Sequence, residues 1–193
     1  LDGFVRWKPY EGGLGHFHYR HHNIYYRAEF PEVLSDCFDH FDSPLMKRTA
    51  HAMSGCETDG EVTLSASSYR PGDYSLPHDD ASGQRTVAFV WYLTRSWRPS
   101  WGGQLFWCPS LAYVEPTFNT LILFNVTPRS LHFVCPVSAH AQGKRLAVNG
   151  WWNRSAQHQE ASATSPMARH LAADLGIDSG EPVVRIGDEI AAL

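Results

Sequence analysis

Apolar and polar residues alternate with a period of two in short segments over most of residues 61–153. Such alternation is typical of β-strands with one buried face, and Gly, Pro, Asn and Asp between the segments indicate turns. Seven or eight strands in succession predict a sandwich or barrel. The strand-like segments are 61–70, 74–80, 85–94, 103–109, 112–116, 120–126, 130–137 and 144–153.

Two helices are predicted before these strands. Residues 31–41 begin with a proline at a first-turn position and place apolar side chains at helical spacing. Ser43 and Pro44 then suit an N-cap and a first helical residue, and the second helix should end near Gly55. The fold is therefore predicted to be mainly β with flanking helices: a double-stranded β-helix (jelly roll or cupin-like barrel) buttressed by N-terminal helices.

The two ends of the chain have different compositions from this centre. Residues 1–30 are rich in Gly and His, and we expect an irregular extension or an edge strand rather than a metal site, since no carboxylate or thiol completes one. Residues 154–193 predict a polar linker, a short helix at 167–176 and a last strand or helical turn. We expect one domain over 1–193, with supporting helices at 31–59, the β core at 60–153 and a tail at 154–193.

Composition restricts the partners. The net charge is −4 and there is no run of Lys or Arg, which argues against nucleic acid or an anionic membrane. The four cysteines lack CxxC spacing, as in a reduced cytoplasmic protein, and neither a membrane span nor a signal peptide is visible. The chain begins at Leu1 rather than Met, so we expect that its natural start lies elsewhere. The oligomeric state stays open.

Alternation also predicts which side chains share a wall. On a strand, His78 and Asp80 point to the same face, and two adjacent ligands of this kind are part of a 2-His-1-carboxylate site for Fe(II). In 85–94, the face that ends at Tyr92 is the smaller and more polar one, and it suits a cavity wall. In 144–153 one face carries four mixed side chains, which suits a small anionic ligand better than a core: Arg145, Ala147, Asn149 and Trp151.

A third metal ligand is predicted at His132, which shares the face of Val134 after an apolar strand. Together with His78 and Asp80 it would leave three iron positions open, two for a bidentate 2-oxo acid and one for O₂. A buried Arg145 requires an anion, and it could hold the far carboxylate of that acid with Tyr92 as a neighbouring hydrogen-bond donor.

The ordered set of these residues resembles the Fe(II)/2-oxoglutarate-dependent dioxygenases of the prolyl 4-hydroxylase type over residues 60–153. The resemblance is carried by Tyr69, Gly72, Tyr74, His78-x-Asp80, Tyr92-Leu93, Gly102-Gly103-x-Leu105, Pro116, Leu123-Phe124, His132-x-Val134, Arg145 and Trp151. It implies iron ligation by His78, Asp80 and His132. It further implies 2-oxoglutarate binding by Arg145, Tyr92 and Tyr69, and a substrate entrance lined by Trp151 and Arg85, which Asn149 adjoins on the same wall.

The resemblance also implies the chemistry: oxidative decarboxylation of 2-oxoglutarate to succinate and CO₂, coupled to hydroxylation of an unactivated C–H bond. The leading substrate is a prolyl residue in a peptide or protein, and the cofactors are Fe(II), 2-oxoglutarate and O₂, with ascorbate as a further candidate. Related halogenases lack the carboxylate that Asp80 supplies here. The alternatives are a hydroxylase of a free amino acid or small metabolite, a cupin-like metal-binding protein without oxygenase activity, and a binding module.

Overall fold

The computed structural model describes residues 6–14, 17–156 and 182–186. Its helices are α1 (Glu32–Asp42), α2 (Pro44–Ser54) and two short 3₁₀ turns, η1 (Arg27–Glu29) and η2 (Pro99–Trp101). The boundary between α1 and α2 follows the predicted capping: the Ser43 side chain accepts a hydrogen bond from the Met46 amide, and Gly55 ends α2 in the left-handed conformation. No helix within the described ranges is long and apolar enough to cross a membrane.

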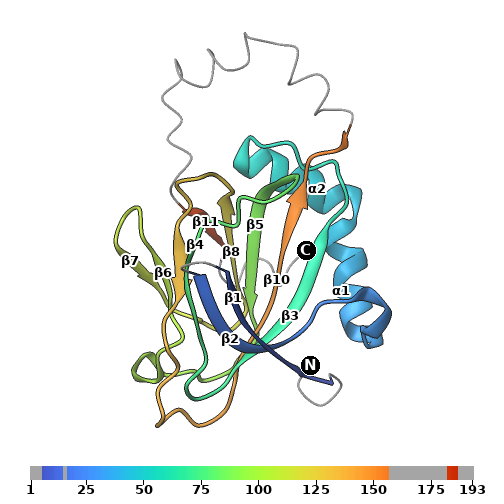
Figure 1. The fold of residues 1–193 in the computed structure, drawn as a ribbon. Helices are drawn as coiled ribbons and strands as arrows, with labels where there is room; N and C mark the ends of the chain where they lie inside the picture. Colours follow the sequence, from blue (N-terminus) through green and yellow to red (C-terminus); the bar gives the residue numbers. More distant parts are fainter. Residues whose placement is uncertain (1–5, 15–16, 157–181, 187–193) are drawn as a thin grey trace.

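Within the described residues, eleven strands form one continuous antiparallel sheet, curled so that its two ends approach each other (Figure 1). Their order is β11-β8-β5-β10-β3-β2-β4-β9-β6-β7, and β1 pairs with β2 outside this path. The strands are β1 (Lys8–Leu14), β2 (Phe17–Ile24), β3 (Thr63–Tyr69), β4 (Tyr74–His78), β5 (Arg85–Tyr92), β6 (Leu105–Trp107), β7 (Ala112–Val114), β8 (Thr120–Asn125), β9 (His132–Val134), β10 (Arg145–Asn153) and β11 (Pro182–Ile186).

Both long helices cover the outer face of β8, β5, β10 and β3 (Figure 1). Phe41 of α1 stacks on Phe89 of β5 with 4.4 Å between ring centroids, and the indole of Trp152 donates to the Phe41 carbonyl at 2.9 Å. Val87 and Val148 belong to the same core. The outward-facing residues of β5 and β10 are therefore those that alternation predicted, because two helices must bury a continuous apolar surface.

The opposite face of these strands forms the interior of the curl. Ala88 and Tyr92 of β5 pack there with Ala147 of β10 and with Leu105 and Trp107 from β6. Strand β2 links the two halves of the sheet, because it pairs with β3 on one side and with β4 on the other. The interior is thus closed by strands that are distant in the sequence.

The prediction of an irregular N-terminal extension is wrong for the described part of residues 1–30. Strands β1 and β2 form an antiparallel hairpin, and β2 lies inside the sheet rather than at its edge. Aromatic and polar rings alternate along β2, and such rings pack well on a pleated surface. Of the predicted tail elements, the helix at 167–176 lies outside the described residues, whereas 182–186 form a strand beside β8.

Candidate active site

A cavity of about 300 Å³ opens on the inner face of the curled sheet. Strands β2, β3, β4, β5, β9 and β10 all contribute to its walls. Eight of the nine residues that the sequence singled out line it: Tyr69, His78, Asp80, Arg85, His132, Arg145, Asn149 and Trp151. The ninth, Tyr92, is fully buried and is not among the lining residues.

His78, Asp80 and His132 come together at one end of the cavity. Their ligand atoms all lie within 4.8 Å of one another. One Asp80 oxygen is 3.7 Å from Nε2 of His78, and the other is 3.6 Å from Nε2 of His132. No other group of three such side chains is found in the described part of the chain. Two imidazoles and one carboxylate on one side of a space are the donor set of a facial Fe(II) site.

Both imidazoles are oriented by the backbone. Nδ1 of His78 donates to the Leu76 carbonyl at 2.8 Å, and Nδ1 of His132 donates to the Ser130 carbonyl at 2.7 Å. Each ring therefore turns Nε2 toward Asp80 with its lone pair available for a metal. Burial lowers the pKa of His132 to about 4, which keeps this ring in the neutral, ligating form at physiological pH.

Pairing between strands explains why the two histidines meet. His78 and His132 are directly opposite each other on β4 and β9, and their ring centroids are 4.4 Å apart. The expectation that Asp80 lies on the strand with His78 is wrong, because β4 ends at His78 and Asp80 has a φ of +61°. Aspartate tolerates this left-handed conformation better than most residues. The backbone turn, rather than strand alternation, brings the carboxylate beside both rings.

Arg145 lies deeper in the cavity and is 2% exposed. Its Nε has no hydrogen-bond partner, and no carboxylate of the described residues forms an ion pair with its guanidinium. A buried cation without a counter-ion is costly, so this position calls for an anionic ligand. The carboxylate of a small dicarboxylic acid, with its other end near the histidine–aspartate–histidine cluster, fits that requirement.

Aromatic faces rather than acidic groups surround Arg145. Its guanidinium carbon lies 5.0 Å from the ring centre of Tyr69 and 4.8 Å from that of Tyr92. Burial raises the pKa of Tyr69 to about 12, so its phenol keeps its proton. Tyr69 lines the cavity, whereas Tyr92 contacts Arg145 from a fully buried position. The role of the Tyr92 hydroxyl as a donor to the cosubstrate stays a prediction.

The mouth of the cavity carries the three residues that were expected at a substrate entrance. Arg85 lies over the Trp151 ring, 3.6 Å from its centre, and its Nη1 is 3.9 Å from a carboxylate oxygen of Asp80. Asn149 lines the same wall and donates to the Ser65 hydroxyl at 3.0 Å. The structure brings these side chains together, and their role toward a substrate stays a prediction.

Sequence reasoning missed the residues that the N-terminal hairpin contributes. Tyr10, Tyr19 and His21 of the hairpin line the cavity, as does Tyr25 just after β2. The ring of His21 stacks on Tyr69 at 4.8 Å and 12°. The signal was present as a period of two through Tyr19, His21 and Asn23, which all face the cavity, but the abundance of histidine masked it.

Comparisons with known proteins agree with this site. Residues 64–153 match the sequence model of the 2OG-Fe(II) oxygenase superfamily. The chain is 30% identical over 135 residues to "Prolyl 3,4-dihydroxylase OGFOD1" of Ostreococcus tauri, which covers 62% of this chain and 26% of that protein. It is 30% identical over 109 residues to "Prolyl 3-hydroxylase OGFOD1" of Mus musculus, covering 52% and 20%. The chain thus spans about a quarter or less of the length of these relatives.

Solved structures share the fold. A prolyl-4-hydroxylase of Pseudomonas putida superposes with a TM-score of 0.59 at 22% identity, covering 71% of this chain and 73% of that one. The viral collagen prolyl hydroxylase of Paramecium bursaria Chlorella virus-1, solved as a 2OG complex, gives 0.54 at 18% identity, covering 70% and 80%. The predicted double-stranded β-helix is confirmed. Residues 64–153, which hold the histidine–aspartate–histidine cluster and the buried arginine, thus match the 2OG-Fe(II) oxygenase superfamily.

Proposed function

We propose that this protein hydroxylates a prolyl residue of a peptide or protein. The observation that carries the proposal is the pairing, in one cavity, of the His78–Asp80–His132 cluster with the buried and uncompensated Arg145. A cupin that only binds a metal has no need of such a cation. When Fe(II), 2-oxoglutarate and O₂ are bound, this family's chemistry converts 2-oxoglutarate to succinate and CO₂ and places one oxygen atom on a substrate carbon.

The residues of the chain would hold the metal ion, bind and orient 2-oxoglutarate, and exclude water from the inner cavity. His78 and His132 would hold Fe(II) through Nε2 and Asp80 through its carboxylate, which leaves the remaining positions directed toward the cavity. Arg145 would bind the distal carboxylate of 2-oxoglutarate with charge-assisted hydrogen bonds. Leu105 and Phe124 line the same space, so its inner end combines few polar contacts with an apolar surface.

The prolyl substrate is supported by the relatives, which are prolyl hydroxylases by name. Their names specify 3-hydroxylation or 3,4-dihydroxylation, whereas the structural neighbour from Pseudomonas putida is named a prolyl-4-hydroxylase. We therefore propose that the prolyl ring is hydroxylated, and we do not specify which ring carbon receives the hydroxyl group. A free amino acid is the alternative that the experiment must separate from it.

The test combines binding with product analysis. Titration of the Mn(II)-loaded protein with 2-oxoglutarate should show binding that Arg145→Gln weakens by about a hundredfold, the order expected for charge-assisted hydrogen bonds. With Fe(II), 2-oxoglutarate and O₂, prolyl peptides should gain one oxygen atom with an equal amount of succinate. Absence of 2-oxoglutarate binding would rule out the oxygenase, and oxidation of free proline but not of peptides would rule out the peptide substrate.

A further inference from the structure

The N-terminal hairpin lies outside the residues that match the oxygenase family, yet it forms part of the cavity wall. Strand β2 is held by main-chain pairing to both β3 and β4, and β1 is paired to β2 along its whole length. Tyr19 and its neighbour across the hairpin, Tyr10, both line the cavity. Their positions are therefore fixed by the sheet.

Tyr10 and Tyr19 form a stacked pair of rings at the cavity. Their rings stack with 4.7 Å between centroids and 16° between planes. A hydrogen bond between the two phenols is the main reason that the pKa of Tyr10 is raised. Gly12 leaves room for this arrangement, since a β-carbon there would lie 3.1 Å from the Tyr19 hydroxyl. We call this pair the tyrosine wall.

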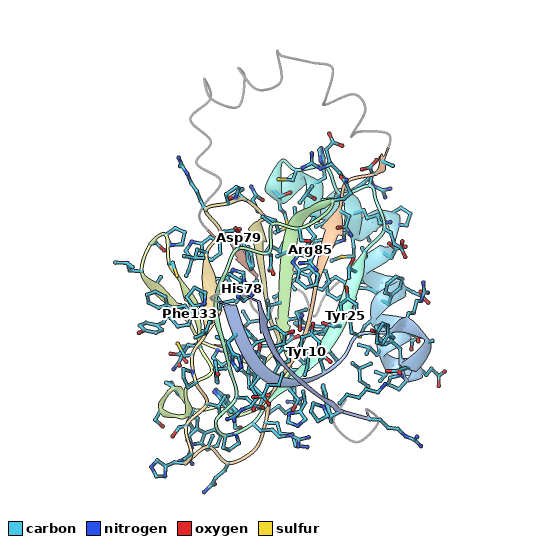
Figure 2. All side chains as sticks on the ribbon, in the orientation of Figure 1. Tyr10, Tyr25, His78, Asp79, Arg85 and Phe133 are labelled. Atoms are coloured by element: carbon cyan, nitrogen blue, oxygen red, sulfur yellow. The ribbon has the colours of Figure 1, made fainter. Side chains whose placement is uncertain are left out.

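A second stack of flat groups lines the same cavity. It consists of the Arg85 guanidinium lying over the Trp151 indole at 3.6 Å. Tyr10, Arg85 and the metal ligand His78 come from three separate strands and are labelled in Figure 2. Arg85 and Trp151 line the same cavity as Tyr10 and Tyr19.

The exposed fractions of these side chains differ, and the difference indicates which size of substrate could contact them. The side chain of Asp80 at the metal end is 11% exposed, whereas Tyr10 is 45% exposed. A free amino acid near the metal ligands would fit in the inner cavity and gain little from Tyr10. In a bound peptide, the chain on either side of the target proline must extend out through the mouth of the cavity. Flat aromatic faces there suit the rings and the extended backbone of proline-rich segments.

We propose, on the basis of the function proposed above, that the tyrosine wall binds the peptide next to the target proline and so makes the enzyme select peptides over free proline. Tyr10 and Tyr19 contribute the stacked ring pair, and the Arg85 guanidinium over Trp151 contributes a further flat group in the same cavity. Proline-rich segments already favour an extended conformation, so little conformational entropy is lost when they bind between such faces.

The experiment measures binding of fluorescent poly-L-proline peptide to the full chain loaded with Mn(II) and 2-oxoglutarate. Tyr10→Ala should weaken peptide binding by about tenfold, as expected for the loss of one aromatic contact and its buried area. Tyr10→Phe should retain most of the affinity, because the ring face is what binds. Tyr113→Ala is the matched control, since Tyr113 is 64% exposed and is not among the cavity-lining residues.

Calorimetry with 2-oxoglutarate on each variant separates the possible outcomes. Weaker peptide binding with unchanged 2-oxoglutarate binding in Tyr10→Ala supports the tyrosine wall. Unchanged peptide binding in that variant, or an equal loss in Tyr113→Ala, overturns it, and so does a Tyr10→Phe variant as weak as Tyr10→Ala. If the unmodified chain binds 2-oxoglutarate but no poly-L-proline, the prolyl substrate itself fails, and the tyrosine wall fails with it.

Discussion

Replacement of Gly103 by alanine should weaken 2-oxoglutarate binding, although Gly103 itself is not among the residues proposed to hold the ligand. Gly103 has a φ of +72°, and a β-carbon there would lie 3.0 Å from Cδ of Arg145. The same β-carbon would be 3.4 Å from a Val137 methyl and 3.6 Å from the Trp97 ring. Because Arg145 is 2% exposed, its side chain cannot move into solvent, so the guanidinium must shift within the cavity.

Two effects contribute, and their sizes can be worked out separately. The left-handed backbone costs a residue with a side chain about 1 kcal/mol of folding stability. Displacement of Arg145 weakens charge-assisted hydrogen bonds worth roughly 1.5–3 kcal/mol, so 2-oxoglutarate affinity should fall by about ten- to a hundredfold. Calorimetric titration of the Mn(II)-loaded variant with 2-oxoglutarate measures the loss of affinity, and urea unfolding measures the loss of stability.

Gly55→Ala supplies the matched control. Gly55 has nearly the same φ, +71°, but nothing lies within 4 Å of a β-carbon built there. It should lose about the same 1 kcal/mol of stability and bind 2-oxoglutarate like the unmodified chain. If Gly103→Ala also binds 2-oxoglutarate normally, then the contact with Arg145 does not fix the guanidinium, and the reasoning is refuted.

Three further predictions concern the metal, the core and the pH dependence. His132→Ala should abolish Mn(II) binding and succinate formation while the chain stays folded by circular dichroism; retained metal binding would contradict the ligand set. Phe89→Ala should cost about 3–5 kcal/mol in urea unfolding, because the ring stacks on Phe41 between sheet and helix; a loss below 1 kcal/mol would contradict its place in the core. Burial, followed by the Arg145 charge, lowers the pKa of His21 in the folded protein to about 4. As the pH drops from 6.5 toward 4, the imidazole is protonated in the unfolded chain before it is protonated in the folded one. The free energy of unfolding of the metal-free protein should therefore fall over this range. His21→Phe should reduce that slope and leave the part that His132 contributes, and an unchanged slope would show that His21 does not contribute.

Local periodicity was sufficient to assign the faces of the long strands. Val87 and Phe89 meet the helices while Ala88 faces the cavity, because helices cover only one side of this sheet. The same reasoning placed Arg145 and Asn149 on the cavity wall. A period of two with one clearly apolar face leaves only one register in which that face is buried.

Periodicity could not show how distant segments pair or how the chain turns. The position of β2 between β3 and β4 depends on pairing across more than forty residues, for which the local pattern carries no signal. Asp80 was assigned to the correct wall by an alternation that the backbone does not follow, since its φ is +61°. A short polar residue after a strand fits both an extended and a left-handed backbone, and the sequence does not distinguish them.

The surroundings of Arg145 show how a buried cation can be kept ready for an anion. Tyr69 and Tyr92 offer ring faces at 5.0 and 4.8 Å, which stabilise the charge only modestly. His21, stacked on Tyr69, has a pKa lowered by burial and by Arg145 itself, so at neutral pH it carries no charge. A carboxylate in any of these places would pair with the guanidinium and compete with the cosubstrate. If Arg145 binds 2-oxoglutarate as proposed, aromatic neighbours leave its guanidinium free to pair with the carboxylate of that ligand.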